Sequence, residues 1–348
     1  MAKTKKHVNY DSGEMRTILG SAIPAALMAS EGCRFDSAED ASVFFARELD
    51  HIKAKSYDVQ YPQFTALEIF PQTHDADPGA DTITYYTFDK QGLAKVIDSY
   101  SDDLPRADVT GKPTTVEIKS LGGSYGYSVQ EMRASRLAGK SLDSRKAESA
   151  RFANDNATNR IAWRGDEENG LMGVLSKGQN IPLFTVGAGA VSSKVSWLEK
   201  TPDEILADVN AMQEQVADTT NDVERPDTLC LPSKVFMHLS NTRLGDGSDK
   251  TIMAFVKENA PYIKEIISAA ELGAKNVETN PYAKAGDDGL GVAFLFTNDE
   301  EKLALEIPMP FMQHTLQIHN LETVVPCESR VAGVIVYYPM SALIAVGV

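Results

Sequence analysis

The sequence predicts an α+β fold in which strands from distant parts of the chain meet in one sheet. Two observations point to this class: two long segments repeat apolar residues at helical spacing, and short β-branched runs occur between and after them. The 348 residues are enough for about two domains. A composition of 43% hydrophobic and 24% charged residues is that of a globular protein and excludes the disordered and collagen-like classes.

The N-terminal part of the chain predicts an arm, a helix and an extended segment. The arm ends before Ser37. An amphipathic helix is predicted over Ser37–Lys53, because Phe45, Leu49 and Ile52 fall on one helical face. The segment Tyr57–Phe70 contains a proline and mixed apolar residues, so we predict that it is extended.

A long hairpin is predicted next. Thr82–Phe88 and Thr114–Ile118 are rich in Thr, Tyr, Val and Ile, which favour strands. Between them, Asp98–Lys112 is acidic and is predicted to be irregular. An isolated two-stranded hairpin is marginally stable in water, so we expect this one to lie on another surface.

A long helical region follows the hairpin. Ser128 and Glu131 have the spacing of a capping box, which marks a helix start. Gly139 is predicted to divide the region, and its second part runs from Leu142 to about Trp163. The apolar stripe of this part is thin and built of small residues, which indicates a strut lying across a sheet.

The second half predicts a helix followed by alternating strands and short helices. Thr201 and Pro202 mark the start of a helix whose apolar residues recur at helical spacing up to Val216. The remaining predicted strands are Asp227–Leu231, Gly291–Thr297, Lys302–Ile307, Val331–Tyr338 and Ala342–Val346, and the predicted short helices are Pro232–Ser240 and Thr251–Glu258.

Charge and cysteine usage narrow the function classes. A net charge of −15 argues against a protein that grips nucleic acid by neutralising phosphates. The three cysteines are odd in number and widely spaced, which predicts free thiols in a reducing compartment. The apolar stretch Ile18–Ala29 contains a proline and follows acidic residues, so we interpret it as part of a non-secretory arm. No run is long enough for a membrane helix, and no membrane association is expected.

One enzymatic motif is present. Gly122–Gly126 matches G-x-S-x-G, with Ser124 as the candidate nucleophile and His314 or His319 as the candidate base. The preceding strand alternates polar and apolar residues, whereas the central strand of a hydrolase is apolar throughout. We therefore favour a turn that leads the hairpin into the helix. Zinc, calcium, phosphate-loop and dinucleotide motifs do not occur, and we expect no catalytic, cofactor or metal site.

Several stretches, taken in order and spacing, carry a family resemblance. They are Tyr61–Pro62 through Ile69–Pro71, Pro78–Tyr85, Asp103–Val109, Tyr125–Ser128 with Glu131, Asn159–Gly165, Gly170–Leu175, Ile307–Pro310, and Val325–Cys327 through Arg330–Val334. Together they resemble the major capsid proteins of tailed bacteriophages, whose fold is shared with encapsulin shells.

The resemblance implies six parts. They are an N-terminal arm (residues 1–36), the first part of a peripheral domain (37–78), an extended E-loop (79–124), the spine helix of the peripheral domain with the segment after it (125–197), an axial domain (198–305), and C-terminal strands of the peripheral domain (306–348).

The resemblance also implies a structural, non-enzymatic protein of the virion. It would be assembled in the host bacterial cytoplasm into hexamers and pentamers of an icosahedral phage head. The head would enclose double-stranded DNA without sequence-specific binding. Asp102, Asp103 and Arg106 at the E-loop tip are the expected inter-subunit contacts.

Other proteins are also expected to take part. The arm before Ser37 is too short for a fused scaffolding domain, so the resemblance implies either a separate scaffolding protein or assembly without one, with a portal and decoration proteins as further candidate partners. Two alternatives remain: an encapsulin-type compartment shell and, from another class, a serine hydrolase using Ser124.

Overall fold

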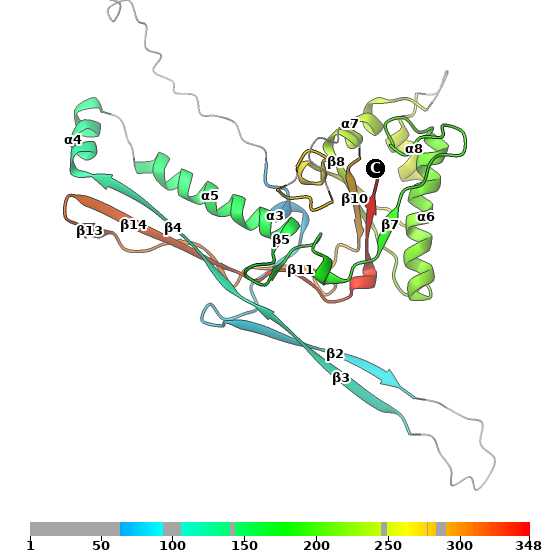
Figure 1. Ribbon diagram of the computed structural model, residues 1–348, viewed down its shortest axis with the longest axis horizontal. Helices are drawn as coiled ribbons and strands as arrows, with labels where there is room; N and C mark the ends of the chain where they lie inside the picture. The colour runs from blue at the N-terminus through cyan, green and yellow to red at the C-terminus, as the bar shows by residue number, and fades with distance from the viewer. Residues whose placement is uncertain (1–62, 93–105, 140–142, 245–248, 277, 283–289) are drawn as a thin grey trace, which may run out of the picture. The chain divides into compact units, whose positions relative to one another are not determined.

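The computed structural model describes residues 63–92, 106–139, 143–244, 249–276, 278–282 and 290–348. The chain divides into two units, Met1–Tyr61 and Pro62–Val348, and every described residue belongs to the second. The predicted arm and the helix over Ser37–Lys53 therefore lie outside the described residues. Helices and strands are mixed along the whole second unit, which confirms the predicted α+β class (Figure 1).

The predicted hairpin is confirmed and is longer than expected. Strand β2 (Thr82–Gln91) runs antiparallel to β3 (Asp108–Glu117), with Thr82 opposite Glu117 and Gln91 opposite Asp108 (Figure 1). Residues 108–112 were expected in the irregular tip and instead extend β3. Local composition disfavours a strand there, but ladder bonds to β2 satisfy the backbone groups of these residues. Among the described residues the two strands pair only with each other.

The chain continues from β3 into a second, longer sheet. Strand β4 (Lys119–Ser128) pairs along its full length with β14 (Glu322–Val331). The other edge of β14 pairs with β12 (Met309–Gln313) and β13 (Gln317–His319). Residues more than 190 positions apart thus form one antiparallel surface.

Two helices follow β4, as predicted. Helix α4 (Val129–Ala138) begins with the full capping box of Ser128 and Glu131 and ends at Gly139, whose φ of 64° is the left-handed conformation that glycine adopts readily. Helix α5 (Asp143–Arg164) lies along the sheet of β4 and β14 (Figure 1). Ser329 on β14 donates to Asn154 on α5 at 2.6 Å, which confirms the predicted strut across a sheet.

A short-stranded sheet lies where α5 ends. Its strands, in spatial order, are β1 (Gln72–Thr73), β11 (Leu303–Glu306), β15 (Gly333–Val336), β6 (Leu171–Met172) and β5 (Gly165–Asp166). Gly333 has a φ of 81°, and a Cβ there would lie 2.4 Å from the carbonyl oxygen of Met172. Only glycine allows β15 to approach β6 this closely.

The last sheet collects strands from three distant regions. Its strands, in spatial order, are β7 (Leu183–Thr185), β16 (Ala342–Val346), β10 (Val292–Phe296), β8 (Thr228–Pro232) and β9 (Glu265–Ala269). Three helices pack beside it: α6 (Pro202–Thr220), α7 (Ser233–Asn241) and α8 (Ile252–Asn259). Short 3-10 turns occupy Lys177–Gln179, Ala270–Leu272 and Pro339–Ser341.

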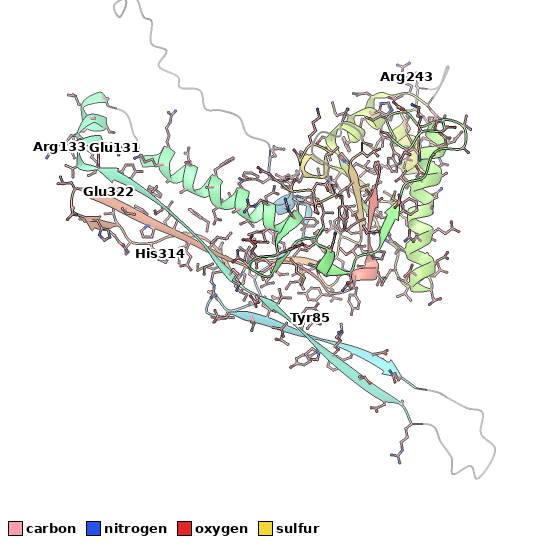
Figure 2. The ribbon with its side chains drawn as sticks, in the orientation of Figure 1. Tyr85, Glu131, Arg133, Arg243, His314 and Glu322 are labelled. Carbon is pink, nitrogen blue, oxygen red and sulfur yellow. The ribbon has the colours of Figure 1, made fainter. Side chains whose placement is uncertain are left out.

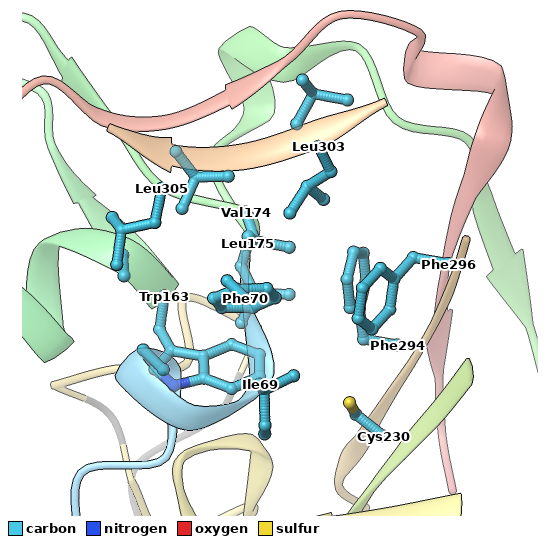
Figure 3. Packing of buried hydrophobic residues seen from close by; sticks show 14 of the residues in the cluster. Ile69, Phe70, Trp163, Val174, Leu175, Cys230, Phe294, Phe296, Leu303 and Leu305 are labelled. Carbon is cyan, nitrogen blue, oxygen red and sulfur yellow. The ribbon is translucent and has the colours of Figure 1, made fainter. Parts of the chain in front are cut away.

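This sheet separates two hydrophobic cores. Alternate residues of β10 point to opposite faces, so Phe294 and Phe296 enter one core and Leu295 enters the other. In the first core, Phe70 packs edge-on against Trp163 with ring centroids 4.9 Å apart (Figure 3). The apolar faces of α6, α7 and α8 cover the second core. Burial on both faces explains why these strands are continuously apolar.

One predicted extended segment is partly helical. Within Tyr57–Phe70, residues Ala66–Ile69 form helix α3. Distant side chains satisfy the amides at its start: the Thr65 amide donates to Glu271 at 3.1 Å, and the Ala66 amide donates to Asn159 at 3.0 Å. Local sequence carries no signal for such capping, because both acceptors come from other parts of the fold.

The C-terminal residues contribute to more than one sheet. Strand β15 joins the short-stranded sheet, whereas β16 pairs with β10 and β7. Residues 306–348 were expected to return together to the peripheral domain, but β16 lies beside strands of the predicted axial range. Its residues are apolar on both faces, which suits a sheet that is covered on both sides.

Candidate assembly surfaces

The hairpin exposes an apolar face. Tyr86 and Phe88 on β2 are 62% and 68% exposed, and Val109 on β3 is 58% exposed. The two aromatic rings are nearly parallel, with centroids 6.3 Å apart. Large apolar side chains gathered on one exposed face mark an interaction surface more often than single scattered ones do.

The hairpin is fastened at its base. Arg330 on β14 donates to the Pro78 carbonyl oxygen at 2.5 Å and to Asp81 at 3.1 Å. Beside these bonds, Tyr85 packs edge-on against Tyr337 with centroids 5.0 Å apart, and Figure 2 places Tyr85 on the hairpin. The base is therefore held to the long sheet, while beyond it the only described strand that pairs with β2 or β3 is the opposite strand of the hairpin.

The predicted contact residues at the hairpin tip are only partly described. Asp102 and Asp103 lie outside the described residues. Arg106 is described and exposed just before β3. The role of all three in contacts between subunits stays a prediction.

The opposite end of the long sheet exposes a second apolar group, which the sequence analysis missed. Leu137 on α4 is 92% exposed, and Leu316, Ile318 and Leu321 around β13 are 59%, 75% and 72% exposed. The Val129 amide donates to the Leu321 carbonyl oxygen at 3.0 Å, which joins α4 to this end. The available signal was the apolar residues beside the turn at Asn320, a position where exposed residues are usually polar.

A charged junction fixes α4 against the start of α5. Glu131 accepts hydrogen bonds from the Ser128 amide at 3.1 Å and from Lys146 at 3.0 Å. The hydrogen bond from Lys146, and then the one from Ser128, hold the pKa of Glu131 below its ordinary value. Lys146 also donates to the Gly126 carbonyl oxygen at 2.7 Å and lies 4.7 Å from the Tyr127 ring centroid. Figure 2 places Glu131, Arg133 and Glu322 together at this end.

The G-x-S-x-G motif does not form a nucleophile elbow. Ser124 lies in the middle of β4, directly opposite Pro326 of β14, so both the elbow and the turn that we favoured for this motif are wrong. The His314 amide donates to the Pro326 carbonyl oxygen from the other side of β14, and its side chain lies 3.2 Å from Glu328. Ser124 and His314 are thus on opposite sides of one strand, about two strand spacings or 9.6 Å apart.

Among the described residues, no group of three or more potential ligands could hold a metal ion. None of the helices in this part of the chain is long and apolar enough to cross a membrane. Cys230 and Cys327 are free, buried thiols, and burial raises the pKa of each. Cys33 lies outside the described residues.

The chain is similar to known proteins in both sequence and fold. A family model described as "Major capsid protein" matches residues 92–348. The fold is similar to the capsid of Myoviridae phage XM1, with a TM-score of 0.72 and 16% identity, covering 88% of this chain and 100% of that one. No curated protein matches the chain.

Two further solved structures share the fold. A chain from Mycobacterium phage Adephagia has a TM-score of 0.58 and 14% identity, with coverage of 87% and 92% of the two chains. A virus-like particle from Pyrococcus furiosus has a TM-score of 0.52 and 14% identity, with coverage of 80% and 91%. At these identities the likeness establishes the fold alone.

Proposed function

This chain belongs to the major capsid protein family, and from that premise we propose that it builds the icosahedral head of a tailed phage from hexamers and pentamers. The family is a structural component of the virion and is not an enzyme class. The family match over residues 92–348 carries the proposal and favours it over an encapsulin-type compartment. The head encloses double-stranded DNA without reading its sequence, which fits a net charge of −15.

In this proposal the hairpin is the E-loop and grips a neighbouring subunit. Supporting observations are the exposed Tyr86 and Phe88 and the attachment of the hairpin at its base through Arg330. Asp102, Asp103 and Arg106 at the tip make polar contacts with the neighbour. The arm and the axial domain keep their predicted ranges, whereas β16 moves from the peripheral domain to the axial domain, because it pairs with β10.

Other proteins complete the particle. Assembly takes place in the host bacterial cytoplasm, guided by a separate scaffolding protein. A portal protein and decoration proteins are the further candidate partners. These partners follow from the family alone, and no described residue is assigned to them.

Replacing the hairpin tip tests the proposal. Residues 92–107 are exchanged for Asn-Gly, a two-residue turn that suits the hydrogen-bonded pair Gln91 and Asp108. We expect a subunit with unchanged circular dichroism and melting temperature that no longer forms shells in negative-stain electron microscopy and light scattering. The control is the full-length tip with Asp102, Asp103 and Arg106 changed to alanine, which separates these side chains from loop length. Shells of normal size from the short-tip variant would contradict the proposal.

A further inference from the structure

The hairpin presents one strand edge whose backbone groups have no partner among the described residues. The Ile118 amide donates to the Asp81 carbonyl oxygen at 2.9 Å, so these residues form a hydrogen-bonded pair, and such pairs recur at every second residue along β2 and β3. The N–H and C=O groups of Thr84, Tyr86 and Phe88 therefore point away from β3. No described strand pairs with this edge.

The other edge of the hairpin is closed to pairing at its centre. Pro113 lies opposite Tyr86, at a position whose backbone nitrogen faces outward from β3. Proline has no N–H to donate and is a common device for blocking an edge strand. The stretch Thr82–Phe88 on β2 contains neither proline nor charge. The hairpin thus has one blocked and one open edge.

The long sheet has a second open edge, on β4. The Val129 amide donates to the Leu321 carbonyl oxygen at 3.0 Å, which sets the same alternation along β4 and β14. The backbone groups of Ser120, Gly122 and Ser124 consequently point away from β14. All three residues are exposed, and no described strand pairs with them.

At the C-terminal end of β4, side chains hydrogen-bond to the outward backbone groups of the edge. The Lys146 ammonium donates to the Gly126 carbonyl oxygen at 2.7 Å, and Glu131 accepts from the Ser128 amide at 3.1 Å. Between Ser120 and Tyr125 the strand carries no charge and no proline. A Cβ placed on Gly122 would meet nothing within 4 Å. No described strand pairs with this length of edge, and its sequence lacks the usual protection against pairing.

The side chains on the two edges are complementary in size. In the hairpin, Phe88 covers its partner Gly111 so closely that a Cβ on the glycine would lie 2.9 Å from the ring. Aromatic residues commonly stabilise a cross-strand glycine in this way. The exposed rings of Tyr86 and Phe88 could cover Gly122 in the same manner if the two open edges met.

We propose that the open edge of β2 in one copy pairs with the open edge of β4 in the next copy, forming a sheet that crosses the subunit boundary. The pairing rests on the proposed function, since it specifies how the hairpin grips its neighbour. Each copy contributes one edge of each kind, so a head-to-tail ring satisfies both edges in every subunit. Strand addition of this type supplies main-chain hydrogen bonds, and the aromatic rings set the register.

Proline variants test the pairing without breaking the hydrogen bonds of the isolated subunit. Tyr86→Pro and Gly122→Pro each remove an outward N–H that pairs with no described strand, just as Pro113 lacks one. Thr115→Pro makes the same change on the blocked edge of the hairpin and is the matched control. We expect all three subunits to melt like the wild type. The first two should raise the critical concentration for assembly by at least about tenfold, while the control assembles normally.

Disulfide trapping identifies the partner strand. Chains carrying Tyr86→Cys are mixed with chains carrying Gly122→Cys, in a Cys33→Ser background, and are assembled and then oxidised. Buried Cys230 and Cys327 do not compete. Covalent dimers are expected from this mixture and not from Thr115→Cys mixed with Gly122→Cys.

The outcomes separate the pairing from the function. Normal assembly by Tyr86→Pro or by Gly122→Pro would overturn the pairing and leave the capsid function intact. Absence of the expected disulfide in assembled particles would do the same. A wild-type chain that forms no shell, tube or ring at any concentration, with or without co-expressed phage proteins, would contradict the proposed function together with the pairing.

Discussion

A buried ion pair at the start of α6 gives a stability prediction that can be worked from the structure. The Lys200 side chain is 1% exposed, and its Nζ lies 2.5 Å from Asp208 Oδ2 and 2.7 Å from the Gly187 carbonyl oxygen. The same Asp208 oxygen accepts from Trp197 Nε1 at 2.9 Å. One carboxylate therefore serves both a buried cation and a buried indole.

Asp208→Ala should destabilise the subunit strongly. The change leaves the Lys200 cation buried with one neutral acceptor, and breaking such a pair costs roughly 3–5 kcal/mol. The Trp197 indole also loses its acceptor, which adds about 1 kcal/mol. A total of about 4–6 kcal/mol is a large share of the 5–15 kcal/mol typical of a folded protein.

Urea unfolding of the unassembled subunit, followed by circular dichroism, measures this loss. Asp208→Asn is the matched control: it keeps an oxygen for the indole and removes the charge, so its cost should be smaller. The double variant Lys200→Met with Asp208→Leu removes both charges and should recover much of the stability, since apolar replacement of buried pairs is often close to neutral. A loss below about 1 kcal/mol for Asp208→Ala, or a double variant as unstable as the single one, would refute the reasoning.

Three further predictions concern other parts of the fold. Hydrogen bonds from three backbone amides, that of Thr201 foremost, hold the pKa of Glu204 far below its ordinary value. The ionised Glu204 side chain therefore stabilises the fold above the unfolded pKa of about 4.3, and this stabilisation fades as the pH falls. Glu204→Gln should melt at a lower temperature than the wild type at neutral pH, and calorimetry should show the difference shrinking below about pH 4. Gly333→Ala, at a φ of 81°, should cost more than about 2 kcal/mol in urea unfolding, whereas Gly187→Ala, with open space around it, should cost little. Ser128→Ala removes the cap of α4 and should destabilise that helix by about 1 kcal/mol, seen as faster amide hydrogen exchange there.

Features that depend on neighbouring residues could be predicted from the sequence. The capping box of Ser128 and Glu131 and the helix start at Thr201 and Pro202 were both predicted from neighbouring residues, and the structure has both. Gly139 ends α4 because its left-handed conformation is a property of that residue alone. Strands β8, β10 and β16, in the sheet between the two hydrophobic cores, were also predicted, since burial on both faces leaves a continuous apolar run.

Features decided by distant partners could not be predicted in this way. Glycines at 122, 123 and 126 favour a turn locally, yet ten pairs with β14 hold them in a strand. Helix α3 begins where Glu271 and Asn159 supply acceptors from other parts of the chain. The exposed residues Leu137 and Ile318 are apolar like core residues, and sequence alone does not separate an assembly surface from a core position.

The place of β16 has a consequence for synthesis on the ribosome. This strand lies between β7 and β10, so β7 has no partner in its sheet until β16 is present. Translation produces β16 after the other four strands of that sheet, and contacts between residues so far apart in sequence form slowly. A nascent or prematurely terminated chain therefore keeps both hydrophobic cores incomplete. A chain that ends before β16 lacks residues of both cores, so we expect it to be less stable than the full chain.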